Sequence, residues 1–138
     1  MTITAVYVFA KEAHGEQLYG ERPYLYHLAC VHAKVLNLYD RDSDLESIAY
    51  LHDTLEDTDT TYGNLCHLFG TKIADAVLAL TKIKGESYEE YITKVKSDHL
   101  TLKVKIAGTL CNLEESVKIS DIKRIKKYTK QLELLMEE

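Results

Sequence analysis

Four ionisable side chains lie close together in the string LHDTLEDT at residues 51–58. An imidazole and a carboxylate, His52 and Asp53, come first, and two carboxylates, Glu56 and Asp57, follow. Imidazole and carboxylate groups both bind divalent metal ions. On a continuous helix of about 3.6 residues per turn, His52 lies one turn below Glu56 and Asp53 one turn below Asp57. The second pair is then placed to orient or deprotonate a water molecule.

The alternative interpretation of this string is an exposed acidic stretch, the usual fate of a run of charges. Leu51 and Leu55 argue against it, because they continue an apolar stripe and place the segment against the core. A further candidate ligand is His27, one turn inside the preceding predicted helix. A histidine found alone in a helix is more often a residue with a satisfied hydrogen bond, so His27 needs support from its surroundings.

The segments that must position these residues are predicted to be helices. Residues that break helices are few, with one proline and six glycines, while residues with high helix propensity recur throughout. Apolar spacing and capping signals predict helices over residues 3–17, 24–39, 45–55, 62–69, 71–80, 87–97, 99–116 and 121–136. Pro23 is expected at the first turn of the second helix, and Ser87 with Glu90 is expected to form a capping box. The fold class predicted is all-α, a compact single-domain bundle of about seven to eight helices.

Composition narrows the classes of function. The 138 residues suffice for one domain with one core, and we expect the domain to span residues 1–138. A formal net charge of -5 argues against broad binding to DNA or other nucleic acid. The three cysteines, Cys30, Cys66 and Cys111, are odd in number and lack CxxC spacing, so neither disulfides nor a zinc site are expected. No leader or apolar run of about 20 residues is evident, which favours a cytoplasmic protein without membrane contact.

Four spaced motifs over residues 5–120 resemble the HD-domain metal-dependent phosphohydrolases, most closely the hydrolase half of the RelA/SpoT alarmone enzymes. The pair His52–Asp53 resembles the doublet that names the superfamily, and residues 56–58 resemble the catalytic acidic pair. Upstream, AHGEQ at residues 13–17 and GERPY at residues 20–24, with His27 after them, are similar to the first motif. Downstream, residues 69–82, which end in Thr-Lys, and VKIAGTLCN at residues 104–112 are similar to the later motifs.

The resemblance implies a set of roles. Mn²⁺, or another divalent ion, would be held by His27, His52 and Asp53, with Glu56 and Asp57 as the catalytic pair. A fourth ligand, an aspartate in the family, is replaced here by Gly108. Arg22 would stack on the guanine base, and the other substrate-binding residues would be Tyr24, Asn112 and Lys82. Because glycine offers no ligand atom, activity is expected to be impaired, and we interpret Gly108 as an inactivating change, with natural loss of catalysis as the alternative.

The function implied is a 3′-pyrophosphohydrolase of guanosine alarmones, which converts guanosine tetra- and pentaphosphate (ppGpp and pppGpp) to GDP or GTP and pyrophosphate. No synthetase domain is expected. One alternative is hydrolysis of another nucleotide or of pyrophosphorylated tRNA, as an antitoxin or phage counter-defence protein opposing a toxic synthetase. The other is a noncatalytic nucleotide-binding module. The basic residues at 123–130 are interpreted as a solvated helix face rather than an RNA site, and the oligomeric state, a homo-oligomer included, stays open.

Overall fold

The computed structural model describes residues 2–138, and most of them are helical. The longer helices are α1 Ile3–His14, α2 Tyr24–Leu38, α3 Ser43–Leu51, α5 Tyr62–Phe69, α6 Thr71–Ala79, α7 Tyr88–Lys96, α8 His99–Lys118 and α9 Ile122–Met136. A single turn, α4 Thr54–Asp57, and two short strands, β1 Leu18–Tyr19 and β2 Arg22–Pro23, complete the described elements. The predicted all-α class is confirmed, with one short helical turn in addition to the expected helices.

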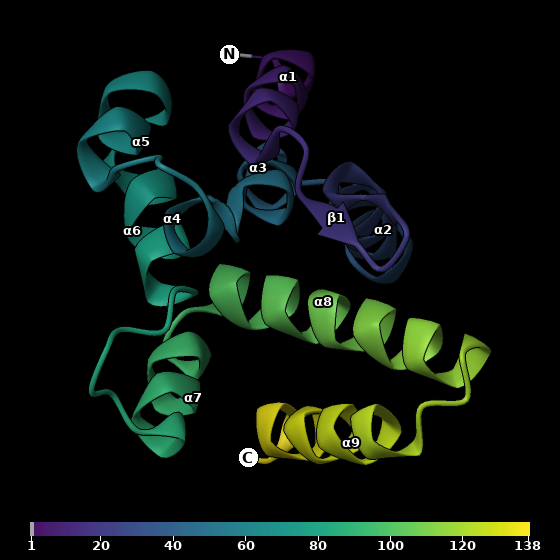
Figure 1. The fold of residues 1–138 in the computed structure, drawn as a ribbon. Coiled ribbons are helices and arrows are strands. Elements are labelled where there is room, and N and C mark those ends of the chain that lie inside the picture. Colours follow the sequence, from purple (N-terminus) through teal and green to yellow (C-terminus); the bar gives the residue numbers. More distant parts are fainter. Residues whose placement is uncertain (1) are drawn as a thin grey trace.

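Helix α8 is the central element of the bundle. It contacts α2 and α3 on one side, α6 and α7 near its beginning, and α9 along its other side (Figure 1). Its residues Leu100, Val104 and Ala107 are buried with Leu28 and Val31 of α2. This burial of apolar surface, worth about 25 cal/mol per Å², supplies the main stabilisation. No helix within residues 2–138 is long and apolar enough to span a membrane.

Side-chain caps determine where several helices begin. The predicted capping box is present at α7, where Ser87 and Glu90 each accept a backbone N–H of the other. Asp42 caps α3 by accepting from the N–H groups of Asp44 and Leu45, and Asp98 caps α8. These caps satisfy N–H groups that have no partner inside the helix. The starts of α3, α7 and α8 are therefore encoded locally.

The predicted first helix is too long at its C-terminal end. It ends at His14 rather than Gln17, because Gly15 adopts a φ of 53° and its N–H donates to the Lys11 carbonyl. The chain then forms an antiparallel ribbon of β1 and β2, with Leu18 opposite Pro23. Pro23 therefore precedes α2 as its N-cap instead of occupying the first turn. Its fixed φ suits both places, so the sequence does not distinguish them.

The predicted continuous helix over residues 45–55 is wrong. Helix α3 ends at Leu51, and His52 and Asp53 form a turn before α4. Thr54 Oγ1 donates to the Leu51 carbonyl at 2.7 Å, and His52 Nδ1 donates to the Ala49 carbonyl at 2.7 Å. Side chains thus take two carbonyls that a continuing helix would use. Because residues 52–56 are not on one continuous helix, the prediction that His52 lies one helical turn below Glu56 is wrong.

We predict that Gly108→Ala raises the free energy of unfolding by about 1 kcal/mol, since glycine inside a helix costs about that much relative to alanine. A Cβ atom at Gly108 would lie 3.9 Å from Val31 Cγ2, an ordinary contact, so packing does not require glycine there. Gly70→Ala serves as the contrast and should lower stability, because Gly70 has a φ of 90°. Urea denaturation of both variants measures the free energy of unfolding. A Gly108→Ala variant that is less stable than the original chain would show that α8 and α2 approach too closely for a side chain.

Candidate metal centre

Three side chains that can bind a metal converge between α2 and the turn after α3. They are His27, His52 and Asp53, and one ligand atom of each lies within 4.8 Å of the others. His27 comes from α2 and is buried, while the other two come from the turn and are mostly buried. The break after Leu51 therefore brings together the three ligands that the sequence predicted.

The orientation of His52 is fixed by the backbone. Because its Nδ1 donates to the Ala49 carbonyl, its Nε2 faces the cluster, 3.0 Å from Asp53 Oδ2. The same Asp53 oxygen accepts a hydrogen bond from the Tyr24 hydroxyl at 2.6 Å. Burial alone would raise the pKa of Asp53, but the charge and hydrogen bond of His52 outweigh burial and lower it. Asp53 is thus an ionised carboxylate, the form that binds a metal.

His27 has the features of a ligand without a protein partner. Its Nδ1 is buried and makes no hydrogen bond within the described residues. Its ring stacks on the ring of Tyr19, with centroids 4.6 Å apart. Burial, together with the nearby His52 and Lys105, lowers the pKa of His27 to about 4. A neutral imidazole beside an ionised carboxylate fits a divalent cation, so the residues present suit the expected metal.

A cleft of about 280 Å³ opens beside these three residues. Glu56 and Asp57 of α4 lie along it, and Glu56 Oε1 accepts a hydrogen bond from the backbone N–H of Lys82 at 3.1 Å. The α8 residues that line it are Val104, Lys105, Gly108, Thr109 and Asn112, and those of α9 are Arg124, Lys127, Tyr128 and Gln131. Carboxylates on one wall thus oppose cationic side chains on the other.

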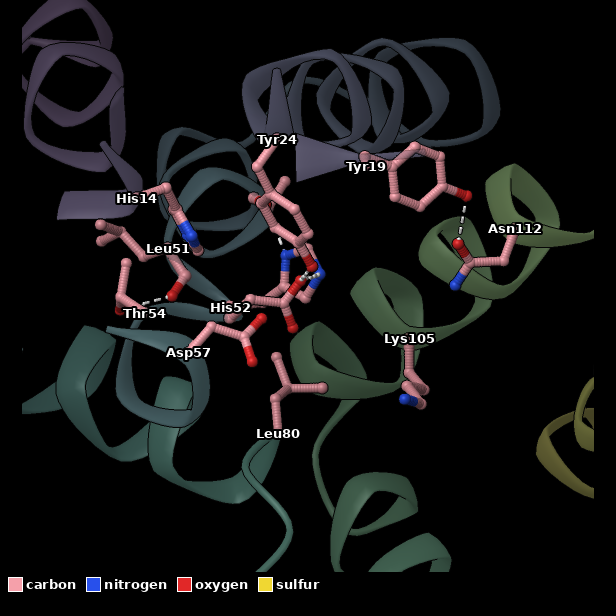
Figure 2. Close-up of polar contacts among 12 residues, drawn as sticks. His14, Tyr19, Tyr24, Leu51, His52, Thr54, Asp57, Leu80, Lys105 and Asn112 are labelled. Carbon is pink, nitrogen blue, oxygen red and sulfur yellow. Dashed lines mark hydrogen bonds and ion pairs between the residues drawn. The ribbon is translucent and has the colours of Figure 1, made fainter. Parts of the chain in front are cut away.

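Two predicted substrate-binding residues lie in this cleft and two do not. Tyr24 and Asn112 line it, and Asn112 Oδ1 accepts a hydrogen bond from the Tyr19 hydroxyl at 2.6 Å (Figure 2). The Arg22 guanidinium instead lies 4.2 Å from the centroid of the Tyr26 ring, outside the lining. Lys82 contributes its backbone N–H to Glu56, while its side chain is exposed. The substrate contacts assigned to these residues stay predictions.

His14 packs against Tyr24, whose hydroxyl donates to the predicted ligand Asp53. Its ring stacks on Tyr24, with centroids 4.6 Å apart, and its Nδ1 donates to Gln17 Oε1 at 2.8 Å. Gln17 Nε2 in turn donates to Asp57 Oδ2 at 3.4 Å. His14 therefore supports Tyr24, and through Gln17 it is linked to a predicted catalytic carboxylate.

Sequence reasoning missed the contribution of α9 to the cleft. Arg124, Lys127, Tyr128 and Gln131 follow a spacing of three, four and seven residues, which places them on one helical face. This spacing could have indicated a cleft-lining face, but the other lysines of the segment make the whole helix look uniformly basic. Lys105 was also missed; burial lowers its pKa, and the nearby Asp53 and Glu56 oppose this effect. The interpretation of residues 123–130 as a purely solvated face is corrected for Arg124 and Lys127.

The chain is similar in sequence to proteins of known family. No protein-family model matches the chain. It is 38% identical over 122 residues to a guanosine-3′,5′-bis(diphosphate) 3′-pyrophosphohydrolase of Aquifex aeolicus, in a match that covers 81% of this chain and 17% of that protein. It is 31% identical over 136 residues to a GTP pyrophosphokinase rsh of Brucella ovis, in a match that covers 90% of this chain and 18% of that protein. The predicted RelA/SpoT resemblance is confirmed. The chain spans only a small part of the length of these curated relatives.

A solved structure has the same fold. It is described as a metazoan ortholog of SpoT that hydrolyzes ppGpp and plays a role in starvation responses. The TM-score is 0.81 at 22% sequence identity, with 97% of this chain and 85% of the other chain covered. The likeness extends over nearly the whole chain, so the arrangement of helices around the site is that of a known fold.

We predict that the chain binds one Mn²⁺ ion and that His27→Ala weakens this binding by tenfold or more, on the order expected for loss of one ligand from a small shell. His67→Ala is the matched control, because His67 is exposed on α5. Isothermal titration with MnCl₂ measures both affinities. Equal affinities for the two variants would show that the ion binds elsewhere.

Proposed function

We propose that this chain is an Mn²⁺-dependent 3′-pyrophosphohydrolase of guanosine alarmones and that Gly108 impairs its turnover. The observation that carries the proposal is the convergence of His27, His52 and Asp53 beside Glu56 and Asp57 in a single cleft. Cationic side chains from α8 and α9 line the same cleft. This combination suits a phosphorylated substrate, and the similar proteins named above are hydrolases or pyrophosphokinases of guanine nucleotides by description.

Different residues of the chain would have different roles in the hydrolysis. When bound, the divalent cation supplies Lewis-acid polarisation of a phosphate oxygen. Glu56 and Asp57 would hold a water molecule and accept its proton as the water attacks the 3′ diphosphate, and the Glu56 carboxylate is oriented for this by the Lys82 N–H. Lys105 would offset the negative charge that the phosphates bring into the cleft. Tyr19 would orient the Asn112 amide toward the substrate.

Gly108 explains why turnover is reduced in this proposal. It lines the cleft from the middle of α8, and glycine provides no ligand atom. Three protein ligands hold a divalent ion more weakly and with looser geometry than four. There is room for a longer side chain, because a Cβ atom added at Gly108 would meet Val31 Cγ2 only at 3.9 Å. An aspartate at this position can therefore reach toward the cleft.

One alternative has a specific observation in its favour. Because Gly108 removes a ligand while the cationic wall of Lys105, Arg124 and Lys127 is intact, a noncatalytic nucleotide-binding module fits the same cleft. Two further proposals rest on the family resemblance alone: another nucleotide or a pyrophosphorylated tRNA end as substrate, and a toxin synthetase as partner. The proposed cytoplasmic location is supported by the three cysteines, whose number and spacing suit a reducing compartment. We therefore rank the alarmone hydrolase first and the binding module second.

We predict that Gly108→Asp increases the rate of pyrophosphate release from ppGpp by 100-fold or more, on the order of the effect of losing a group that stabilises transition-state charge. The assay compares the two chains at equal Mn²⁺ concentration. Gly108→Ala is the matched control, because it removes the glycine without supplying a ligand and should show no increase.

Two other results would change the proposal. Tight ppGpp binding with no turnover in either the original chain or Gly108→Asp would replace the enzyme with the binding module. Equal gains from Gly108→Ala and Gly108→Asp would show that helix stability, rather than metal coordination, limits the activity.

A further inference from the structure

Two of the three cysteines face each other across the α2–α8 contact. Cys30 Sγ and Cys111 Sγ lie 2.6 Å apart, although the residues are 81 positions apart in sequence. This separation lies between the length of a disulfide bond, about 2.05 Å, and the contact distance of two unbonded sulfur atoms. The third cysteine, Cys66, is on α5 and is not part of this pair. The helices themselves therefore hold two thiols in position for a bond.

The two thiols differ in their access to solvent. Cys111 is 3% exposed, and its burial raises the pKa of its thiol. Cys30 is only partly buried and lines a surface hollow of about 270 Å³ together with Ala33, Lys34 and Asn37. The hollow is separate from the cleft described above. A small reagent can therefore reach Cys30 directly and Cys111 only through it.

The side chain of Lys34 lies close to the two cysteines. Lys34 lines the hollow and forms an ion pair with Glu114 of α8, one turn away from Cys111. The positive charge of its ammonium group partly offsets the burial that raises the pKa of the Cys111 thiol. The hollow thus combines an accessible thiol, a stabilising cation and a second thiol within reach. These are the elements of a thiol oxidation site.

We infer that Cys30 and Cys111 form a reversible disulfide that links α2 to α8 when a peroxide oxidises Cys30 from the surface hollow. The Cys30 thiolate attacks one peroxide oxygen, which gives a sulfenic acid and releases hydroxide that leaves as water. The Cys111 sulfur then attacks the Cys30 sulfur, loses its proton, and displaces the second oxygen as water. Two thiols and one hydrogen peroxide molecule thus give one disulfide and two water molecules.

The link joins α2, which carries His27 of the candidate metal centre, to α8, which lines the cleft beside that centre. Cys30 lies one turn after His27 on α2, and Cys111 is the neighbour of Asn112 on α8. Oxidation therefore fixes α2, which carries the predicted ligand His27, against α8, which contributes Lys105 and Asn112 to the cleft. In a reducing compartment such bonds are transient and redox-sensing, so the predicted cytoplasmic location is compatible with this role.

The experiment treats the Cys66→Ser chain with hydrogen peroxide, blocks free thiols with N-ethylmaleimide, and maps the proteolytic peptides by mass spectrometry without reductant. The expected product is a peptide pair joined through Cys30 and Cys111 that dithiothreitol separates. The melting temperature of the oxidised chain should rise on the order of 10 °C, because the bond closes a loop of 81 positions in the unfolded chain. The matched control, Cys30→Ser with Cys66→Ser, should show neither the joined peptides nor the rise.

The inference is overturned by either of two results. Cys30 and Cys111 that carry N-ethylmaleimide after treatment, or Cys30 that proceeds to sulfinic acid unlinked, would show that the thiols do not react with each other. A joined pair with a lowered melting temperature would show that the native helix positions do not accommodate the bond. Neither readout depends on nucleotide turnover, so the result is separate from that of the proposed function.

Discussion

The hydrogen bond from His52 Nδ1 to the Ala49 carbonyl is the contact on which the metal centre depends. It occupies a carbonyl that a continuing α3 would use, and Thr54 does the same for the Leu51 carbonyl. The chain therefore turns after Leu51, and this turn directs His52 Nε2 and the Asp53 carboxylate toward His27 of α2. Because Nδ1 donates to this carbonyl, Nε2 is the ring nitrogen that faces Asp53 and is placed to bind a metal. Two local hydrogen bonds thus set the turn of the backbone, and the one from His52 also sets the orientation of its ring.

Helix α8 connects the hydrophobic core to the cleft. Its buried face packs on α2 and α3, while Lys105, Gly108 and Asn112 line the cleft. Gly108 weakens this helix by about 1 kcal/mol relative to alanine, with no positive φ and no close contact that requires glycine. Neither conformation nor packing accounts for it. The proposal that Gly108 replaces a metal ligand therefore rests on the family resemblance and on its place in the lining of the cleft.

The sequence predicted the helices well because their ends are encoded by nearby residues. The Ser87–Glu90 capping box and the positive φ of Gly70 are local signals, and α5, α6 and α7 lie close to their predicted bounds. The break after Leu51 was missed because it depends on side-chain bonds that compete with a helix, and the apolar stripe continues across it. The pairing of Cys30 with Cys111 depends on the packing of α2 against α8, which no local pattern reports.

The candidate site was predicted unevenly for a similar reason. The predicted ligands His27, His52 and Asp53 were identified from motifs, and the fold brings their side chains together. The cationic wall from α9 was not, because lysine and arginine are ordinary on exposed helices and only the fold shows which of them turn inward.

The most direct test is X-ray diffraction at the manganese absorption edge from crystals of this chain grown with Mn²⁺ and ppGpp. Our account predicts one anomalous peak within coordination distance of His27, His52 and Asp53, with the 3′ diphosphate between that peak and the carboxylates of Glu56 and Asp57. A nucleotide bound in the cleft with no anomalous peak, or a peak at a different group of side chains, would contradict it.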